Sequence, residues 1–335
     1  MSEPLQHYVP KFMLRRFSSG GRALVHAFDK HQDKIFAFST SKKSKVGVAA
    51  ERAIYDFEFQ GVPMTLEPAL SSLETKAAEV IARVIAAQAL PPDWHEEKAI
   101  LASFMAVQLV RTKATMATFD DLSSRMEGFF RAEGAPEEFF QPDPMVGSKE
   151  NARKAHYAAL ISNASRDWAP LLLQKVWHLI KTTDDVPFFM GDHPVVRFND
   201  PNAEGRGKVG LASTGVQLYF PLSPTLALSL MCPTYLEMMI DGIERIDRLL
   251  LGRLGDPKSL RAQRKEISGI VEALLAGSMT EVRPENVEHF NSLQVLEAER
   301  YVFSIRNDFS MVREMIQEDE SARRGTRMVE GSGHF

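Results

Sequence analysis

The amino-acid sequence predicts an α+β fold with a predominantly helical core and a small antiparallel or mixed sheet. Three long segments in the middle of the chain have helical periodicity, and short β-branched and aromatic runs flank them. The chain has 335 residues, of which 44% are hydrophobic, so it can bury a sizeable core. We expect a single domain over residues 1–310, in which an N-terminal β-hairpin and the helical core reach to about 185 and a sheet-containing part covers 186–310.

The first elements are short. Pro10 is suited to open a helix that ends before the Ser-Ser-Gly-Gly run at 18–21. Alternating apolar runs then predict strands over 24–28, 35–38 and 54–59. These segments form the expected N-terminal hairpin.

The central segments have helical periodicity over about 65–90, 94–131 and 149–182. Between Ala99 and Val110 the second segment is apolar nearly all round, which is typical of a central buried helix. The acidic stretch 133–143 is the expected linker between the second and third helices.

The remainder alternates between the two classes of element. We expect strands over 188–190, 195–198, 216–220 and 226–231, helices over about 233–252, 257–277 and 284–299, and a last strand over 301–305. Residues 311–335 are rich in charge and glycine, and they predict a disordered tail.

Composition excludes several classes of protein. Cys232 is the only cysteine, so neither an intramolecular disulfide nor a cysteine-based metal cage can form, which fits a reducing cytosol. No apolar run reaches the roughly 18 residues that a membrane span needs, and no signal-peptide pattern is present. We therefore expect a cytoplasmic protein that does not associate with a membrane.

The charge of the first 50 residues is uneven, with nine Lys or Arg against three acids. Such a basic segment, interleaved with Tyr8, Phe12 and Phe17, could contact nucleic acid through phosphates and base stacking. The alternative is that the lysines at 42, 43 and 45 form a solvated loop.

The run His7-Tyr8-Val9-Pro10, followed by Leu14-Arg15-Arg16-Phe17, resembles the opening of a widespread, mainly bacterial family, the domain of unknown function 4238 (DUF4238). Further family landmarks are Leu73-Glu74, 108–112, 189–194, 220–224 and 291–294, so the resemblance spans roughly residues 5 to 307. His193 departs from the Asn that the family usually has after the Asp. The resemblance implies no established activity.

Two central segments carry polar residues at buried positions. Glu74 falls inside an apolar helical arc, where a carboxylate needs a partner. Gln108 and Arg111 share one stripe of the central helix, and Arg111 must find a carboxylate because it cannot deprotonate. We expect a contact with Glu67, Glu74 or Asp192, either as a structural ion pair or as an anion clamp in a pocket.

The later landmarks are polar as well. Asp192 follows a predicted strand and is suited to catalysis, metal binding or an Asx turn. His193 lies beside it. Asn291 and Gln294 project from the apolar side of the last long helix, so their amides either bind the sheet backbone or line a pocket.

His7 is the side chain best suited to acid–base chemistry or metal binding, unless it is a core residue that holds the N-terminal segment. The leading hypothesis is a hydrolase for phosphoryl or phosphodiester substrates, in which His7, Glu74, Arg111 and Asp192 converge on one pocket. Arg15, Gln108, His193, Asn291 and Gln294 would assist binding. A divalent metal ion held by Glu74 and Asp192, with His7 as base or ligand, is the implied cofactor. The competing hypothesis is a non-catalytic module that binds nucleic acid or a protein.

Overall fold

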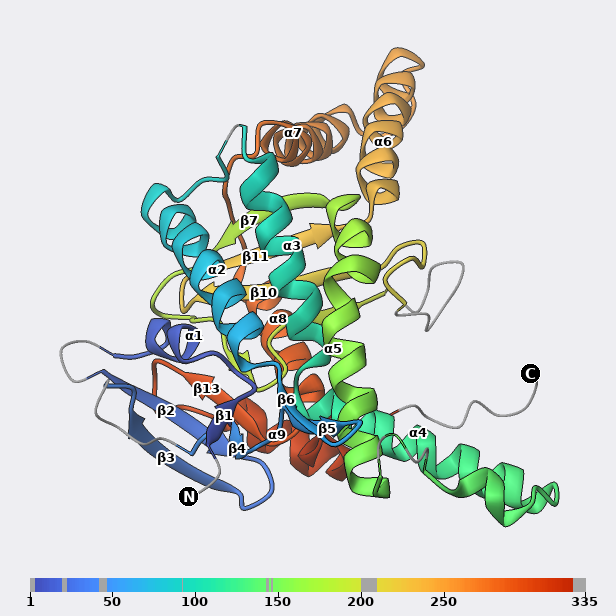
Figure 1. Cartoon of the computed structure of the whole chain (residues 1–335). Helices are drawn as coiled ribbons and strands as arrows, with labels where there is room; N and C mark the ends of the chain where they lie inside the picture. Colours follow the sequence, from blue (N-terminus) through green and yellow to red (C-terminus); the bar gives the residue numbers. More distant parts are fainter. Residues whose placement is uncertain are drawn as a thin grey trace.

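The computed structural model describes residues 4–19, 23–41, 47–91, 93–142, 145, 147–199 and 210–327. Long helices lie against small sheets in it, which confirms the α+β class (Figure 1). The helices are α1 (Lys11–Arg16), α2 (Glu67–Ala87), α3 (His95–Val110), α4 (Lys113–Ala132), α5 (Lys149–Leu173), α6 (Pro233–Leu251), α7 (Pro257–Leu275), α8 (Pro284–Glu297) and α9 (Ser310–Glu318), with 3₁₀ turns η2 (Glu137–Phe140) and η3 (Glu320–Arg323). The strands are β1 (Leu5–His7), β2 (Leu24–Asp29), β3 (Lys34–Ser39), β4 (Ala50–Arg52), β5 (Asp56–Phe59), β6 (Val62–Thr65), β7 (Val176–Lys181), β8 (Met190–Gly191), β9 (Val196–Phe198), β10 (Gln217–Ser223), β11 (Leu226–Met231), β12 (Thr280–Glu281) and β13 (Tyr301–Ser304).

The described strands form two larger sheets and two small ladders. The first sheet has the order β12-β7-β11-β10-β9 and is antiparallel except where β12 runs parallel to β7. The second has the order β3-β2-β13-β8, so a late strand lies between the N-terminal hairpin and β8. β1 pairs with β4, and β5 pairs with β6. The N-terminal and C-terminal parts of the chain therefore share one sheet.

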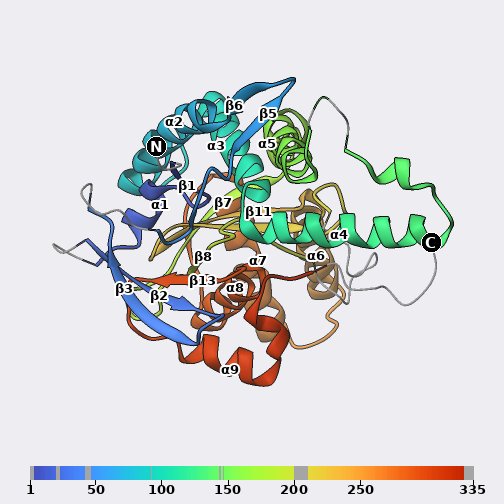
Figure 2. The ribbon, with the colours of Figure 1, turned by 60° about the horizontal axis from the view of Figure 1, so that its bottom comes forward.

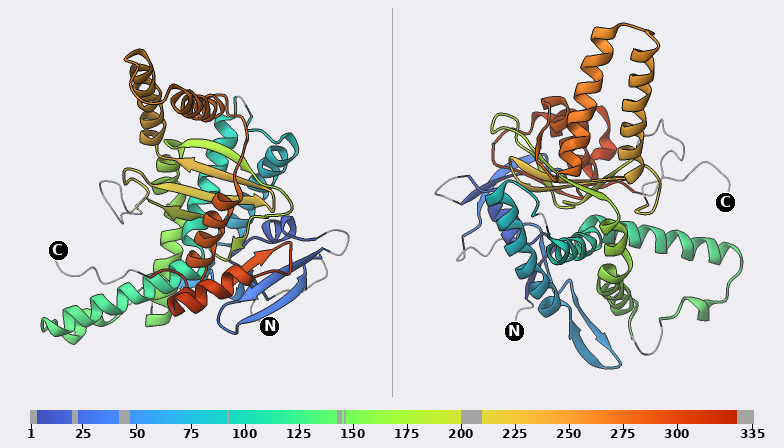
Figure 3. Two further views of the ribbon diagram at one scale, coloured as in Figure 1. Left: turned by 180° about the vertical axis from the view of Figure 1, so that it is seen from behind. Right: turned by 90° about the horizontal axis from the view of Figure 1, so that it is seen from above.

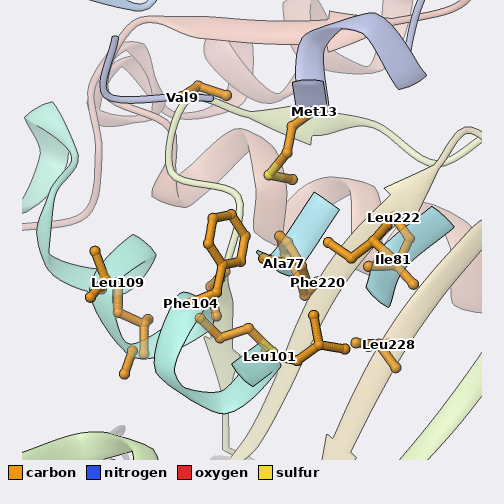
Figure 4. Packing of buried hydrophobic residues seen from close by; sticks show 14 of the residues in the cluster. Val9, Met13, Ala77, Ile81, Leu101, Phe104, Leu109, Phe220, Leu222 and Leu228 are labelled. Carbon is orange, nitrogen blue, oxygen red and sulfur yellow. The ribbon is translucent and has the colours of Figure 1, made fainter. Parts of the chain in front are cut away.

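The main core lies between the five-stranded sheet and the helices α2, α3 and α5, with α3 in the middle (Figure 1 and, from behind, Figure 3). Phe104 and Leu101 of α3 are fully buried, as are Phe220 and Leu228 of the sheet. Figure 4 shows these side chains around α3, with Met13 of α1 packed into the same cluster. The expectation of a central buried helix between residues 99 and 110 is confirmed.

The expected helix over 94–131 is two helices, α3 and α4, which separate at Arg111 and Thr112. Thr112 is extended, with φ −92° and ψ 160°. Two tyrosine hydroxyls satisfy the carbonyls at the break: Tyr55 donates to Arg111 O at 3.0 Å, and the Tyr157 hydroxyl lies 2.6 Å from Val110 O. The helical periodicity of the sequence continues through the break, so this pattern does not indicate where α3 ends. The contacts at the break come from Tyr55 and Tyr157, which are distant in the chain.

The expected helix over 149–182 ends at Leu173, and its last part is strand β7. The run from Val176 to Lys181 is rich in Val, Trp and Ile, which favour strands. β7 lies between β11 and β12, whose backbone hydrogen bonds replace those of the helix. Sheet pairing therefore overrides the helical pattern.

The expectation of a disordered tail over 311–335 is wrong for residues 311–327, whereas residues 328–335 lie outside the described part. α9 buries Val312 and Ile316 beside Phe309, in a small hydrophobic cluster that also contains residues of β2 and α8. Figure 2 shows α9 against α8 at the edge of the body. The 3-4 spacing of Phe309, Val312 and Ile316 is the signal for this helix, and the charges around it obscured that signal.

Ile316→Ala tests the docking of α9. Ile316 is 4% exposed, so removing most of its side chain should lower the free energy of unfolding by about 2–5 kcal/mol. Gln317→Ala, on the exposed side of α9, is the matched control and should leave stability nearly unchanged. Equal urea midpoints for the two variants would show that α9 is not docked.

Candidate functional site

An open groove of about 610 Å³ lies between the N-terminal segment and α2. Its volume is within the range of small-molecule sites. β1, α1 and α2, which form it, lie side by side in Figures 1 and 2. The lining residues are Leu5, His7, Lys11, Phe12, Arg15, Glu67, Ser71, Glu74, Thr75, Ala78, Glu79 and Ala82.

The α1 wall of the groove is basic. α1 begins after Pro10 and buries Met13 and Leu14 in the core. Lys11 and Arg15 are four residues apart, which places them on one face of the helix, and both are exposed. A short amphipathic helix thus presents two cations to the groove.

The α2 wall is acidic. Glu67 and Glu74 are seven residues apart and lie on one stripe of the helix, with Ser71 between them. Burial raises the pKa of Glu67, and the negative charge of Glu74 raises it further. Opposite charges therefore face each other across the groove, and one of the carboxyls holds its proton to a higher pH than usual.

Arg111 lies behind the groove and joins its walls. The side chain is 2% exposed, and its Nη2 donates to Glu74 Oε1 and to the carbonyl of His7, both at 2.7 Å. Tyr55 lies beside the guanidinium, 5.7 Å from ring centroid to Cζ. The expectation that Arg111 is buried against a carboxylate is confirmed, and the carboxylate is Glu74.

Gln108 completes the attachment of the N-terminal motif. Its Nε2 donates to the carbonyl of Tyr8 at 2.8 Å, one residue after the carbonyl that Arg111 holds. The last turn of α3 and its C-cap residue thus fix the backbone at residues 7 and 8, and His7 is among the residues that line the groove. Gln108 therefore positions the backbone of the N-terminal motif and does not itself line the groove.

Asp192 follows directly after β8 and is not among the residues that line the groove. Its carboxylate accepts backbone N–H bonds from Glu299 at 2.7 Å, Arg300 at 3.0 Å and Tyr301 at 3.1 Å. Burial nevertheless raises the pKa of Asp192 to about 6, against the opposing effect of these bonds. Its oxygens fix the turn before β13, and it does not line the groove.

The two amides of α8 hold the same strand. Asn291 accepts from Phe189 N at 2.7 Å and donates to Pro187 O at 3.0 Å. Gln294 accepts from Gly191 N at 2.8 Å and donates to Pro194 O at 3.0 Å. A Cβ on Gly191 would meet the backbone oxygen of Gln294 at 2.7 Å, so this close contact requires glycine. Both amides bind backbone, and neither lines the groove.

His193 is buried at the helix break. Its Nδ1 lies 2.6 Å from the hydroxyl of Thr112, and burial lowers its pKa to about 3. A neutral imidazole there joins the segment after β8 to the start of α4. His193 therefore has a place in the packing, away from the groove.

The expected metal site does not assemble. Among the described residues, no group of three or more His, Cys, Asp or Glu side chains is placed to hold a metal ion. Of the proposed ligands, Glu74 is bound to Arg111, and the carboxylate of Asp192 accepts from three backbone amides. His7 and Glu74 share the groove, whereas Asp192 does not join them.

Some residues of the groove were not among the expected site residues. From the sequence, Lys11 is expected only as part of the basic N-terminal segment, although its spacing to Arg15 is a usable signal. Glu67, expected among the partners of Arg111, instead lines the groove together with Glu74 and Glu79. Ser71 and Thr75 carry no motif, and only the packing of α1 on α2 identifies them.

The fold and the groove define an α+β protein with a charged surface site beside a buried arginine. The family model described as "Protein of unknown function (DUF4238)" matches residues 5–308, and the chain belongs to this family. No curated protein and no solved structure matches it. Within the described residues, no helix has the length and apolar character needed to cross a membrane.

Removing the two partners of the Arg111–Glu74 ion pair one at a time should lower the free energy of unfolding by unequal amounts. Glu74→Met leaves the guanidinium of Arg111, 2% exposed, without a counter-charge and should cost about 3–5 kcal/mol of stability. Arg111→Met leaves Glu74, whose side chain is 26% exposed and can be hydrated, and should cost less. Urea unfolding of both variants and of the double variant measures this difference. A larger cost for Arg111→Met would contradict it.

Asp192 should make stability depend on pH. Its pKa rises from 3.8 to about 6 on folding, so the native state binds the additional proton between these values. The corresponding stability is present below pH 3.8 and is lost as the pH rises through about 6. Asp192→Asn cannot titrate, and the stability difference between wild type and variant should change across this window. If the unfolding free energies of wild type and Asp192→Asn change in parallel from pH 3.5 to 7, Asp192 does not have the raised pKa.

Proposed function

We propose that the groove between α1 and α2 is the active site of a hydrolase that acts on phosphoryl or phosphodiester substrates. One observation carries the proposal: a histidine, a carboxyl group with a raised pKa and two exposed cations line the same open cavity. Acid, base and anion-binding groups are what hydrolysis of a phosphate ester requires. We propose a cytoplasmic location for this activity, because a single cysteine fits a reducing compartment.

Each side chain has a definite role in the proposed reaction. A water oxygen attacks phosphorus while its proton passes to the imidazole of His7. The bond from phosphorus to the leaving oxygen breaks, and that oxygen takes the proton of Glu67, whose raised pKa suits it as the acid. Lys11 and Arg15 bind the phosphoryl oxygens and offset the charge that develops on them.

Other residues act by positioning. Arg111 holds both Glu74 and the backbone of His7, so it sets the distance between the acidic wall and the imidazole. Glu74 raises the pKa of Glu67 through its negative charge. Asp192, expected as a catalytic group, contributes only through the packing of β8 and β13.

The test uses p-nitrophenyl phosphate, bis-p-nitrophenyl phosphate and a labelled single-stranded oligonucleotide, each with and without Mg²⁺. His7→Ala and Glu67→Gln should each lower kcat by about 10²- to 10⁴-fold, because each removes a proton-transfer group. The wild-type rate should fall as the pH rises above the pKa of Glu67, and Glu67→Gln should lose this dependence.

Matched controls are His31→Ala and Glu96→Gln, two exposed residues outside the groove, and both should keep full activity. Lys11→Gln with Arg15→Gln should mainly raise KM. Full turnover by His7→Ala would rule out the proposed base. Absence of turnover by the wild-type protein on all three substrates would reject the phosphoryl assignment.

A non-catalytic module that binds nucleic acid is the second candidate. The observation in its favour is that Asp192, Asn291 and Gln294 all bind backbone, as expected of a structural polar network. Lys11 and Arg15 would then contact phosphates, together with the lysines at 42, 43 and 45, which lie outside the described residues. Replacing those three lysines with Gln should weaken salt-sensitive binding of the oligonucleotide in a filter assay. His7→Ala should leave that binding unchanged.

A further inference from the structure

The α6–α7 hairpin is poorly covered. It spans residues 233–275, all of which the structure describes, and it projects from the sheet on the side away from α2, α3 and α5 (Figure 3, right). Of its two helices, α6 buries only Ile246, and α7 buries only Val271 and Leu274. Two helices alone make a thin core, so this hairpin lacks a covering layer.

Apolar side chains are exposed at both ends of the hairpin. Leu251 is 85% exposed and Leu254 60% exposed at the tip, where α6 turns into α7. Met238 is 65% exposed and Leu275 68% exposed near the base, where the helices join the sheet. Four large apolar side chains on one projecting element indicate an interaction surface.

The charges of the hairpin are also divided between its ends. The base half, residues 233–242 and 266–275, contains four acids and no Lys or Arg. The tip half, residues 243–265, contains seven Lys or Arg and three acids. An acidic base and a basic tip of this kind are complementary to a second hairpin that runs the opposite way.

The two helices of the hairpin are fixed to each other, and several of their outer charges remain available, whereas Glu266 at the base pairs with Arg283. Arg264 of α7 binds Asp247 of α6 through two bonds of 2.5 and 3.0 Å, which hold the helices together. Among the described residues, no ion pair involves Glu237, Asp241 or Arg253. A partner can therefore meet them without breaking a contact within the chain.

We propose that two copies of this chain pair through their α6–α7 hairpins as an antiparallel four-helix bundle. The basic tip of one hairpin lies on the acidic base of the other, and the twofold axis makes both contacts equivalent. Leu251 and Leu254 of one copy then meet Met238 and Leu275 of its partner. A second copy is favoured over an unrelated partner because one surface supplies both complementary halves.

The dimensions suit this pairing. Each helix has 19 residues and is about 28 Å long, so two overlapping hairpins form a bundle of about that length. The two bodies then lie at opposite ends of the bundle. The helices α1 and α2, which carry the walls of the groove, lie across the sheet from the hairpin (Figure 3), so pairing leaves the groove open.

Charge reversal in the full chain gives a specific test. A base variant, Glu237→Lys with Asp241→Lys, brings the net charge of the base half from −4 to 0, and a tip variant, Arg253→Glu with Arg261→Glu, brings that of the tip half from +4 to 0. Each should lose at least about tenfold in dimer affinity, because the attraction between the tip of one copy and the base of the other is removed. A mixture of the two should form heterodimers, because the unchanged basic tip of the base variant then meets the unchanged acidic base of the tip variant, a contact that neither homodimer contains. Sedimentation velocity at low and high salt measures these masses.

The matched control is Glu314→Lys with Glu318→Lys, the same change of charge on exposed positions of α9, and it should dimerise as the wild type does. Circular dichroism of each variant checks that it is folded, and heterodimer formation itself requires folded hairpins. A wild-type protein that is monomeric at 50 μM in low salt would overturn the proposal. So would a dimer that neither reversal weakens, because its interface would then lie elsewhere.

Discussion

The buried guanidinium of Arg111 is the constraint on which the candidate site depends. It cannot lose its charge, and at 2% exposure it cannot be hydrated, so the fold must bring a counter-charge to it. Glu74 supplies that charge from α2, and the carbonyl of His7 supplies a second acceptor from β1. One side chain at the end of α3 thereby sets where the acidic wall stands relative to the N-terminal motif.

The polar residues of the chain divide into two groups by their partners. Asp192, Asn291 and Gln294 bind backbone atoms and hold β8 between α8 and β13. Lys30 extends this group: its Nζ donates to the carbonyls of Val295 and Ala298, each at 2.6 Å, at the end of α8. Such groups stabilise the fold, because an unpaired buried polar atom would be costly. The second group, on the walls of the groove, faces solvent and carries the proposed chemistry.

The two proposed surfaces are independent of each other. The groove is formed by β1, α1 and α2, and the hairpin extends from the other side of the five-stranded sheet (Figure 3). A change in association state therefore need not alter the groove, and a change in the groove need not alter association. The sheet separates the two surfaces and, with α3, supplies much of the main hydrophobic core.

The sequence by itself determined the family, the α+β class, most helix and strand positions, and the need of Arg111 for a carboxylate, because periodicity and burial cost are local properties. It did not determine the break after Val110, the strand at β7 or the docking of α9. Each of these depends on partners distant in the chain, such as Tyr55, Tyr157 and β11. Sequence also placed Asp192 with His7 because both are polar residues on apolar segments. Only the tertiary structure decided that backbone amides, and no side-chain cluster, satisfy Asp192, because backbone donors have no sequence signature.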